Sequence, residues 1–530
     1  MSTARKTPAP DDPQFNLFSG LADAVDEPEL KASATTGRRF VTGDPHRIFL
    51  GQARLEEYLK QAGQQTPFIV ARLLDEQDWK PFEQRYAPTG RAPYSPRQMM
   101  GLILYGVMQG VSSLRGLERL ARLDLGCLWI AGGITPDHAN LGRFILMHEA
   151  SLTQGFFEAL TQSILQATRS GATRSNGKRL AGDGTVIEAA CSHYRLLKEE
   201  AVRERVACAR EAVRQAPEDD RARGALEQAE QCQALFEVRQ AARESHGKST
   251  ESLRISASEP EAMVQRLKRG RGFAASYKPS VLANEDRIVL AHAVDASSET
   301  LVLAPLLEQS ERILGTPVEE LLLDAGYFDD EVIAETLARE ISLLCPPGKW
   351  PEEIPAHKLF HKSQFEYDAE LDRYRCPAGQ TLRVIAQTRQ TERTREHKVY
   401  ATSACEGCAW RSRCTQSAKG RRLKRYPEDE ARDALRTVML HPRARHIFSR
   451  RKAMVEPVFG AIRSAQGLNR FRRRGLQAVK REFALHVLAY NLSRAVALMC
   501  FYWVWICLIS ALRRFGRSGP GISRSCFGYP

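Results

Sequence analysis

The N-terminal stretch lacks any apolar run. Residues 1–42 mix proline, aspartate, glutamate, lysine and serine without the hydrophobic core that a signal peptide or a membrane anchor requires. We therefore expect a flexible lead-in segment on a protein of a reducing, bacterial-type cytoplasm, associated with the nucleoid. In such a compartment stable disulfides are rare, so clustered members of the 12 cysteines are expected to bind metal.

Acidic residues are too few to balance the basic ones. The 530-residue chain has 77 lysines and arginines against 63 aspartates and glutamates, a formal net charge of +14. This balance disfavours an acidic small-molecule ligand and favours a polyanion, of which nucleic acid is the natural candidate. Because the chain is longer than one hydrophobic core usually organises, we expect two or more domains.

Residues 43–170 have the periodicity of helices. Apolar side chains recur at helical spacing after Ser95-Pro96, a pair typical of a helix start, and a second apolar stripe follows the break at residues 110–112. Two short helices joined by a tight turn are typical of a helix-turn-helix, and we predict an all-α DNA-binding domain. Two ordinary core helices would give the same pattern, because the spacing reports packing only.

Strand patterns begin at residue 178 and indicate a second, α/β domain over residues 171–494. Two charged, alanine-rich helices divided at 217–220 predict a helical-hairpin insertion at 195–247, whose alternating charges are typical of a solvated face. The order of the other elements is that of a mixed sheet flanked by helices. The expected strands are 178–190, 272–282, 286–295, 318–323 and 341–345, and the expected helices are 298–314, 330–339 and a long helical region from 443 onward.

Two aspartates occupy positions where a charge is costly unless it has a use. Asp183 lies within a strand-like run between Gly182 and Gly184, and Asp324 directly follows an apolar run. A carboxylate there must reach solvent, a partner or a metal ion, and ligands of α/β sheets bind at the carboxyl ends of strands. The two glycines would leave room for a ligand. Each acid taken singly has the alternative of a cap, a turn or an ion pair.

Glu456 is the only acid in the strongly basic stretch 441–475. The basic side chains of this stretch suit a phosphate backbone, and its phenylalanines suit exposed bases. A lone glutamate would repel DNA unless it held a cation that DNA also needs. The candidate DNA-contacting residues are Arg451, Lys452, Arg463, Arg470, Arg472 and Arg473.

The sequence around these three acids resembles the catalytic motifs of bacterial insertion-sequence DDE transposases. The motifs are Asp-Gly-Thr at 183–185, Asp-Ala-Gly-Tyr at 324–327 and Val-Glu-Pro-Val-Phe-Gly at 455–460. The resemblance runs from about residue 94 to residue 494, and it implies an RNase H-like core.

Two further positions qualify the resemblance around the glutamate. The basic residues that often flank the family's glutamate are matched by Lys452 and Arg463. The family's upstream tyrosine is missing, because Phe448 and Ser449 stand in that neighbourhood. Any role of that tyrosine is therefore in doubt here.

The resemblance implies a catalytic triad of Asp183, Asp324 and Glu456 that holds two Mg²⁺ or Mn²⁺ ions, with Asp183 bridging both. Hard cations prefer carboxylate oxygens, and two such ions stabilise the charge that develops in phosphodiester transfer. We expect strand cleavage at transposon ends, followed by attack of the freed 3′-hydroxyl on target DNA. The expected partners are double-stranded DNA with terminal inverted repeats, target DNA and a second copy of the chain in a homodimer.

Two other functions share much of this evidence. An RNase H-like nuclease would use the same metal site without joining strands. A decayed, non-catalytic DNA-binding derivative of a transposase would keep the basic surface alone, although the intact triad argues against that alternative.

Four cysteines cluster in the polar segment 370–425, namely Cys376, Cys405, Cys408 and Cys414. A CxxC pair with two further cysteines has the ligand count of a tetrahedral structural zinc site, and a loop-rich segment needs such a staple to hold its shape. We therefore predict a small zinc-knuckle insertion, and similar knuckles occur in some of these transposases. Unligated surface thiols and a redox disulfide are the alternatives.

The final segment, 495–530, is atypical. Residues 495–512 are mostly apolar, and a tail rich in glycine, serine and arginine follows. The length would allow a membrane span, so a membrane protein is a third alternative. The apolar pattern continues an amphipathic run that begins near Leu485, and we therefore favour a buried helix that runs into an unusual tail.

Overall fold

The computed structural model describes residues 40–168, 178–192, 196–245, 247–266, 272–348, 359–391 and 394–515, with side chains up to residue 500. The chain divides into two compact units. Unit 1 consists of Met1–Ser170, Ile187–Tyr277 and Val458–Pro530, and unit 2 consists of Gly171–Val186 and Lys278–Pro457. Both contain helices and strands, which confirms the mixed α/β class.

The N-terminal part of unit 1 is built around helix α5. Every residue of α5 from Met99 to Val107 is buried, and the helix packs against α3, α7 and α19. Helix α6 begins after the turn at Gly110, and Ser113 caps it by accepting the backbone N–H of Gly116. These helices are α2 (Leu55–Gln61), α3 (Thr66–Asp75), α4 (Lys80–Glu83), α5 (Pro96–Met108), α6 (Leu114–Leu123), α7 (Leu125–Ile130), α8 (His138–Met147), α9 (Glu149–Thr153) and α10 (Gly155–Thr168), beside the short hairpin of β1 (Phe49–Leu50) and β2 (Ala53–Arg54).

Helix α19 (Leu476–Phe515) is a core element of unit 1. It packs against α5, α9 and α10. Within the described residues it is the one helix long and apolar enough to cross a membrane, over Leu476–Cys500, and 61% of its most apolar window is buried in the structure. Such burial is typical of a core helix. The tail predicted beyond it lies outside the described residues from 516 onward.

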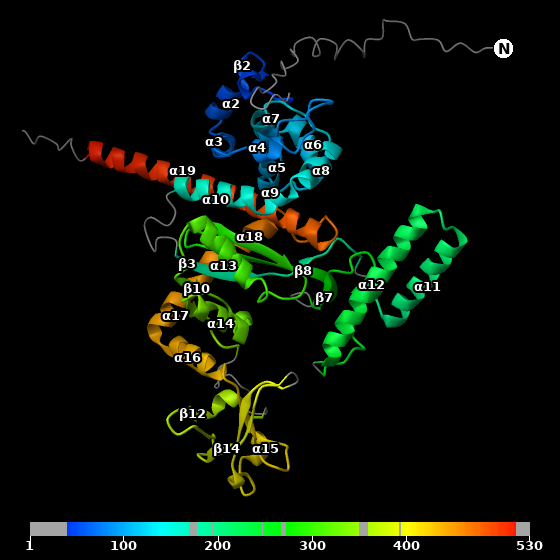
Figure 1. Ribbon diagram of the computed structural model, residues 1–530. Coiled ribbons are helices and arrows are strands. Elements are labelled where there is room, and N and C mark those ends of the chain that lie inside the picture. Colours follow the sequence, from blue (N-terminus) through cyan, green and yellow to red (C-terminus); the bar gives the residue numbers. More distant parts are fainter. Residues whose placement is uncertain are drawn as a thin grey trace, which may run out of the picture. The chain divides into compact units, whose positions relative to one another are not determined.

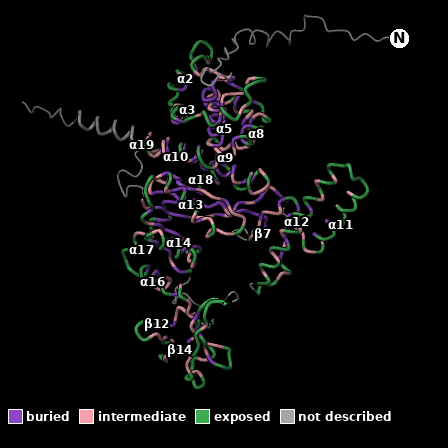
Figure 2. The backbone as a smooth tube through the Cα atoms, viewed as in Figure 1, coloured by how far each residue is buried: buried purple, intermediate pink, exposed green. Residues whose placement is uncertain are grey.

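The predicted helical hairpin lies within unit 1 and consists of α11 (Glu199–Gln215) and α12 (Asp220–Ser245), flanked by the paired strands β5 (Leu196–Leu197) and β6 (Ile255–Ser256). Figure 2 shows that most of its surface is exposed. A small apolar cluster holds its base together, formed by Val202, Cys232, Phe236, Leu253 and Ile255.

The main sheet has seven strands, and strand β8 begins in unit 1 and ends in unit 2. In unit 2 the strand order is β11-β10-β3-β8-β9, with β3, β10 and β11 mutually parallel and β8 antiparallel to both β3 and β9. In unit 1, β4 and β7 pair with the first half of β8. The strands are β3 (Arg179–Gly184), β4 (Ile187–Glu188), β7 (Met263–Arg266), β8 (Phe273–Ala283), β9 (Val289–Asp295), β10 (Glu320–Leu322) and β11 (Ser342–Leu344).

Helices flank the sheet of unit 2. Helix α13 (Leu303–Leu314) packs on β9, and α14 (Asp330–Ala338) and α16 (Asp429–Leu440) pack on β11 (Figure 1). Helix α13 starts later than the predicted residue 298, because Asp295 accepts the backbone N–H groups of Ser297 and Ser298 and holds them in a turn. The predicted long helical region is α17 (Pro442–Ser449), α18 (Arg451–Ser464) and α19, with an irregular break at 465–475.

The cysteine-bearing segment is not the loop-rich segment that we expected. It forms an antiparallel sheet of β12 (Glu366–Asp368), β13 (Arg373–Arg375), β14 (Thr381–Thr388), β15 (His397–Ala401) and β16 (Leu423–Arg425), with the short helix α15 (Arg411–Cys414). This sheet has an aromatic core of its own, made of Phe360, Phe365, Tyr374, Leu382, Tyr400 and Leu423. The expectation of a loop-rich segment was wrong, because aromatic residues that stand singly among charged ones in the sequence pack together into a core.

Candidate catalytic centre

The parallel pairing of β3 with β10 brings Asp183 and Asp324 to one edge of the sheet of unit 2. Leu322 of β10 pairs with Ala181 of β3. Asp324 and Asp183, two residues further on, therefore lie at the carboxyl ends of neighbouring strands. Both carboxylates contact the same guanidinium nitrogen, Nη2 of Arg451, at 2.9 Å for Asp183 and 3.7 Å for Asp324. The structure thus brings together two of the three predicted acids.

Arg451 is the counter-ion of this pair. Its side chain is only 7% exposed, and its Nε donates a hydrogen bond to the backbone carbonyl of Gly182 at 3.1 Å. A buried guanidinium of this kind is stable only when carboxylates or carbonyls satisfy it. A DNA contact by Arg451 remains a prediction. In this structure its Nε and Nη2 donate hydrogen bonds to Gly182 and Asp183.

The two glycines beside Asp183 are required by packing. A methyl group on Gly182 would lie 2.4 Å from a side-chain carbon of Leu323, and one on Gly184 would lie 2.5 Å from the carboxyl carbon of Glu299. Protein side chains therefore fill the space that we had expected to be left for a ligand. Asp324 also has a local role, since its Oδ1 accepts the backbone N–H of Gly326 at 2.9 Å and caps a short 3₁₀ turn.

Glu299 is a third carboxylate at the same edge, and the sequence reading missed it. It follows β9, which runs in the same direction as β3, and its carboxylate lies 3.7 Å from the ammonium of Lys278. The charges of Asp183 and Asp324 both act on Glu299. The strand directions could have revealed it, because β9, β3 and β10 run the same way and their carboxyl ends share one sheet edge. In the sequence, however, Glu299 lies in a polar turn that resembles an ordinary helix start.

Burial acts on the pKa of two of these acids, Asp183 and Glu299. Burial raises the pKa of Asp183, the guanidinium of Arg451 opposes that rise and the charge of Asp324 reinforces it. Burial likewise raises the pKa of Glu299, against the effect of Lys278. Burial thus disfavours the charged form of Asp183 and Glu299, and a cation beside these carboxylates favours that charged form.

Glu456 stands apart from this cluster. It is exposed on α18, whereas its neighbours Met454 and Val455 are buried and anchor the helix. Among the described residues, no hydrogen bond or ion pair joins Glu456 to Asp183 or Asp324, and no group of three or more histidine, cysteine, aspartate or glutamate side chains is arranged as a metal site. The structure therefore brings Asp183 and Asp324 together without a contact to Glu456, and the triad stays a prediction.

An arginine loop, residues 469–475 of unit 1, carries three of the predicted DNA contacts. Buried glutamates hold its backbone: Glu482 accepts the N–H groups of Arg472 and Arg473 at 2.9–3.0 Å, and Glu259 accepts that of Gly475 at 2.7 Å. The guanidinium of Arg470 bonds to the backbone carbonyls of Ala189 and Cys191.

The predicted DNA-contacting residues differ in how accessible their side chains are. Arg472 and Lys452 are exposed, and Arg463 and Arg473 are partly buried. Arg470 is exposed at its surface, but its guanidinium is engaged with backbone carbonyls of its own unit. Arg472 and Lys452 are consequently the two members of the set whose charge is most available to a phosphate.

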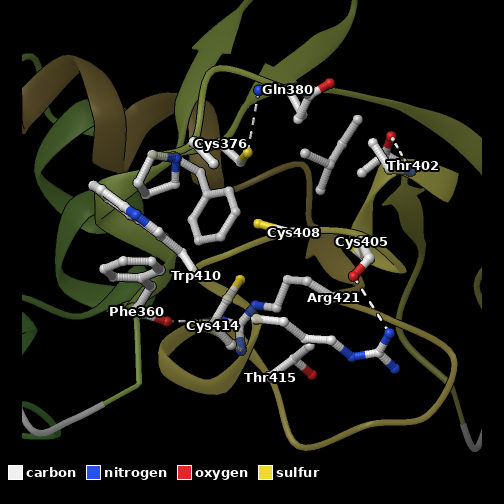
Figure 3. Close-up of a pocket in the computed structure, with 16 residues that line it drawn as sticks. Phe360, Cys376, Gln380, Thr402, Cys405, Cys408, Trp410, Cys414, Thr415 and Arg421 are labelled. Atoms are coloured by element: carbon white, nitrogen blue, oxygen red, sulfur yellow. Dashed lines mark hydrogen bonds between the residues drawn. The ribbon is translucent and has the colours of Figure 1, made fainter.

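The four predicted zinc ligands line one small cavity of about 20 Å³, enough for a single water molecule, but among the described residues no three of these thiols are arranged as a metal site. Figure 3 shows the sulfur atoms of Cys376, Cys408 and Cys414 directed into it. The Sγ of Cys376 accepts the backbone N–H of Gln380 at 3.3 Å, and Cys405 packs against Gly420. All four thiols are free of disulfides.

Two family models match the chain. A model described as a transposase domain (DUF772) matches residues 58–146, which cover most of the helices from α2 to α8, and one described as a transposase DDE domain matches residues 375–496. The second match contains Glu456 and the arginine loop, while Asp183 and Asp324 lie outside both. These matches confirm the resemblance to insertion-sequence DDE transposases. No match to a curated protein or to a solved structure was found.

The close packing at Gly182 gives a first prediction. Gly182→Ala should lower the free energy of unfolding of unit 2 by about 1–3 kcal/mol, because the new methyl group collides with Leu323 and Leu282 inside the sheet. Urea denaturation monitored by circular dichroism measures this loss. Gly348→Ala in the same unit is the matched control, since nothing lies within 4 Å of its added carbon. Equal stability of the two variants would contradict the packing role.

Proposed function

We propose that this protein is a DNA transposase that cleaves strands at transposon ends and joins the freed 3′-hydroxyl to target DNA. The observation that carries the proposal is the convergence of Asp183 and Asp324, from motifs far apart in sequence, on one sheet edge, where both contact Arg451. The matches to two transposase domains support it independently. In this role the protein would act on DNA in the bacterial cytoplasm, as a homodimer that pairs two ends.

An RNase H-like arrangement of the catalytic domain is part of this proposal. The order β9-β8-β3-β10-β11, with one antiparallel β8 between strands of the opposite direction, supports it. So does the position of Asp183 on the first strand of the domain and of Asp324 just after the fourth. In such a sheet the acids meet because their strands are neighbours, whatever their separation in sequence.

The donor set at the sheet edge fits divalent cations. Asp183 and Asp324 offer carboxylate oxygens, which Mg²⁺ and Mn²⁺ prefer, and they already share one cationic partner in Arg451. We propose that these two residues, joined by Glu456, hold the ions. When bound, such ions supply charge neutralisation at the attacking and leaving oxygens of the phosphodiester. The role of the protein is to fix the two aspartates on a rigid sheet and to bring Glu456 to them on α18.

Asp183→Asn tests the catalytic role. This variant should lose strand cleavage and strand transfer by a factor of about 10³ or more while it retains binding to the transposon end, because the amide keeps the shape but not the charge of the carboxylate. Cleavage and joining of labelled end duplexes measure both steps. Asp219→Asn, an exposed change in the hairpin turn, should behave as wild type.

The outcomes separate the competing functions. Full cleavage by Asp183→Asn would refute the catalytic assignment. Cleavage without joining in the wild-type protein would favour the RNase H-like nuclease, and DNA binding without either step would favour the non-catalytic derivative.

We also propose that DNA lies along the basic stretch, with contacts from Lys452, Arg463, Arg472 and Arg473. The helix pair α5 and α6 would add contacts through the exposed Arg115 and Arg119 of α6 if it acts as a helix-turn-helix. Each lost phosphate contact removes counterion release and lowers the salt dependence of binding.

Lys452→Gln and Arg472→Gln test this surface. Each should weaken duplex binding and reduce the slope of log K against log salt by about one, and the effect should be the same for specific and unrelated sequences. Fluorescence anisotropy at several salt concentrations measures the slope. Arg221→Gln, on the exposed hairpin, is the control. A slope unchanged from wild type in both variants would remove these residues from the interface.

A structural zinc ion between Cys376, Cys405, Cys408 and Cys414 is the last part of the proposal. The common cavity supports it, and so does the N–H donated to the Cys376 sulfur, a contact that stabilises a thiolate. The aromatic core of the segment means that zinc would reinforce a sheet that already has packing of its own.

Elemental analysis of protein purified under reducing conditions should find about one zinc per chain if the four thiols form a site. Cys408→Ser should lose it, and Cys208→Ser, at an exposed position on α11, should keep it. Absence of zinc from the wild-type protein would leave the four thiols unligated and contradict the site.

A further inference from the structure

Arg451 occupies the place where a cation shared by the two aspartates has to lie. One of its nitrogens, Nη2, is 2.9 Å from Oδ1 of Asp183 and 3.7 Å from Oδ2 of Asp324. Within the described residues, the other contact of this side chain with the sheet is the hydrogen bond that Nε donates to the carbonyl oxygen of Gly182. The guanidinium is therefore held by the same strand edge that the proposed metal ions need.

The carboxylates at this edge do not carry enough negative charge to hold both the Arg451 guanidinium and a divalent ion. Asp183, Asp324 and Glu299 supply three negative charges, and Arg451 and Lys278 supply two positive ones, with Lys278 directed to Glu299. A divalent ion between the aspartates together with the guanidinium would place like charges within a few ångströms in a partly buried site, which is unfavourable. A guanidinium also covers carboxylate oxygens that the ion requires as ligands.

We propose that Arg451 is a positioning residue that stands in for the metal, holds Asp183 and Asp324 together in the metal-free protein, and is displaced from them when a divalent ion binds. This inference rests on the proposed function, and it adds a competition between a side chain and an ion at the same two carboxylates.

The place of Arg451 in the chain gives the displacement a further consequence. Arg451 is the first residue of α18, the helix that carries the exposed Glu456. In the described part of the chain, no metal-type cluster joins Glu456 to the aspartates. Release of the guanidinium loosens the tie between the start of α18 and β3, so the helix becomes free to bring Glu456 toward the ions. The anion that then receives the released guanidinium is a phosphate of the bound DNA, which agrees with the basic character of the stretch.

Mn²⁺ binding to the full chain, measured by electron paramagnetic resonance without DNA, tests the competition. Arg451→Gln should bind Mn²⁺ about tenfold more tightly than wild type, because the ion no longer has to displace a buried ion pair. The Mn²⁺ affinity of Arg451→Lys should lie between those of wild type and Arg451→Gln, since an ammonium keeps the charge but cannot form the planar contact. Arg450→Gln is the matched control: this neighbour is exposed and pairs with Glu285 at 3.7 Å, so its affinity should equal that of wild type.

Thermal unfolding gives a second measurement on the same variants. In EDTA, Arg451→Gln should melt below wild type, because two neighbouring carboxylates lose their counter-ion, and Mn²⁺ should raise its melting temperature more than it raises that of wild type. A variant that unfolds completely in EDTA and refolds with Mn²⁺ would support the same conclusion.

Equal or weaker Mn²⁺ binding by Arg451→Gln than by wild type would overturn the inference. If Asp183→Asn abolishes Mn²⁺ binding while Arg451→Gln leaves it unchanged, the metal centre stands and only the competition is refuted. If no variant binds Mn²⁺, the proposed metal centre falls together with the inference.

Discussion

The parallel pairing of β3 with β10 is the constraint on which the candidate centre depends. It sets Asp183 and Asp324 on adjacent strand ends, where burial raises the pKa of Asp183 and an uncompensated pair of carboxylates would be unstable. Arg451 resolves that instability from within the protein. The start of α18 lies at this edge, because Arg451, the first residue of the helix, contacts both aspartates.

Local sequence patterns predicted the elements of unit 2 well, because strand and helix periodicity is a property of short stretches. The expected strands 272–282 and 286–295 correspond to β8 and β9, and the expected helix 330–339 corresponds to α14. Asp183 and Asp324 were identified because each charge interrupts an apolar run. Their meeting at one edge required the strand order, which the resemblance implied and the periodicity could not.

The roles of Arg451 and Glu299 and the core of the cysteine segment could not be predicted from local sequence patterns, since each depends on tertiary contacts. Arg451 looks like one more basic residue in a basic stretch, and only its burial against β3 distinguishes it from the exposed Lys452. Glu299 lies in a polar turn, and only the shared direction of β9 and β3 places it at the same sheet edge as Asp183. In the cysteine segment, single aromatic residues on separate strands, such as Tyr374 and Tyr400, meet to form a core, and no single strand shows enough apolar residues to reveal it.

The glutamates beneath the arginine loop have a thermodynamic consequence for association with DNA. A loop dense in arginine normally samples many backbone conformations, and ordering it against a ligand costs conformational entropy. Here the carboxylates of Glu482 and Glu259 hold the backbone N–H groups of the loop before any ligand arrives. The entropic cost of ordering this backbone is therefore incurred during folding, so under the proposed function Arg472 would lose only side-chain freedom when it binds a phosphate.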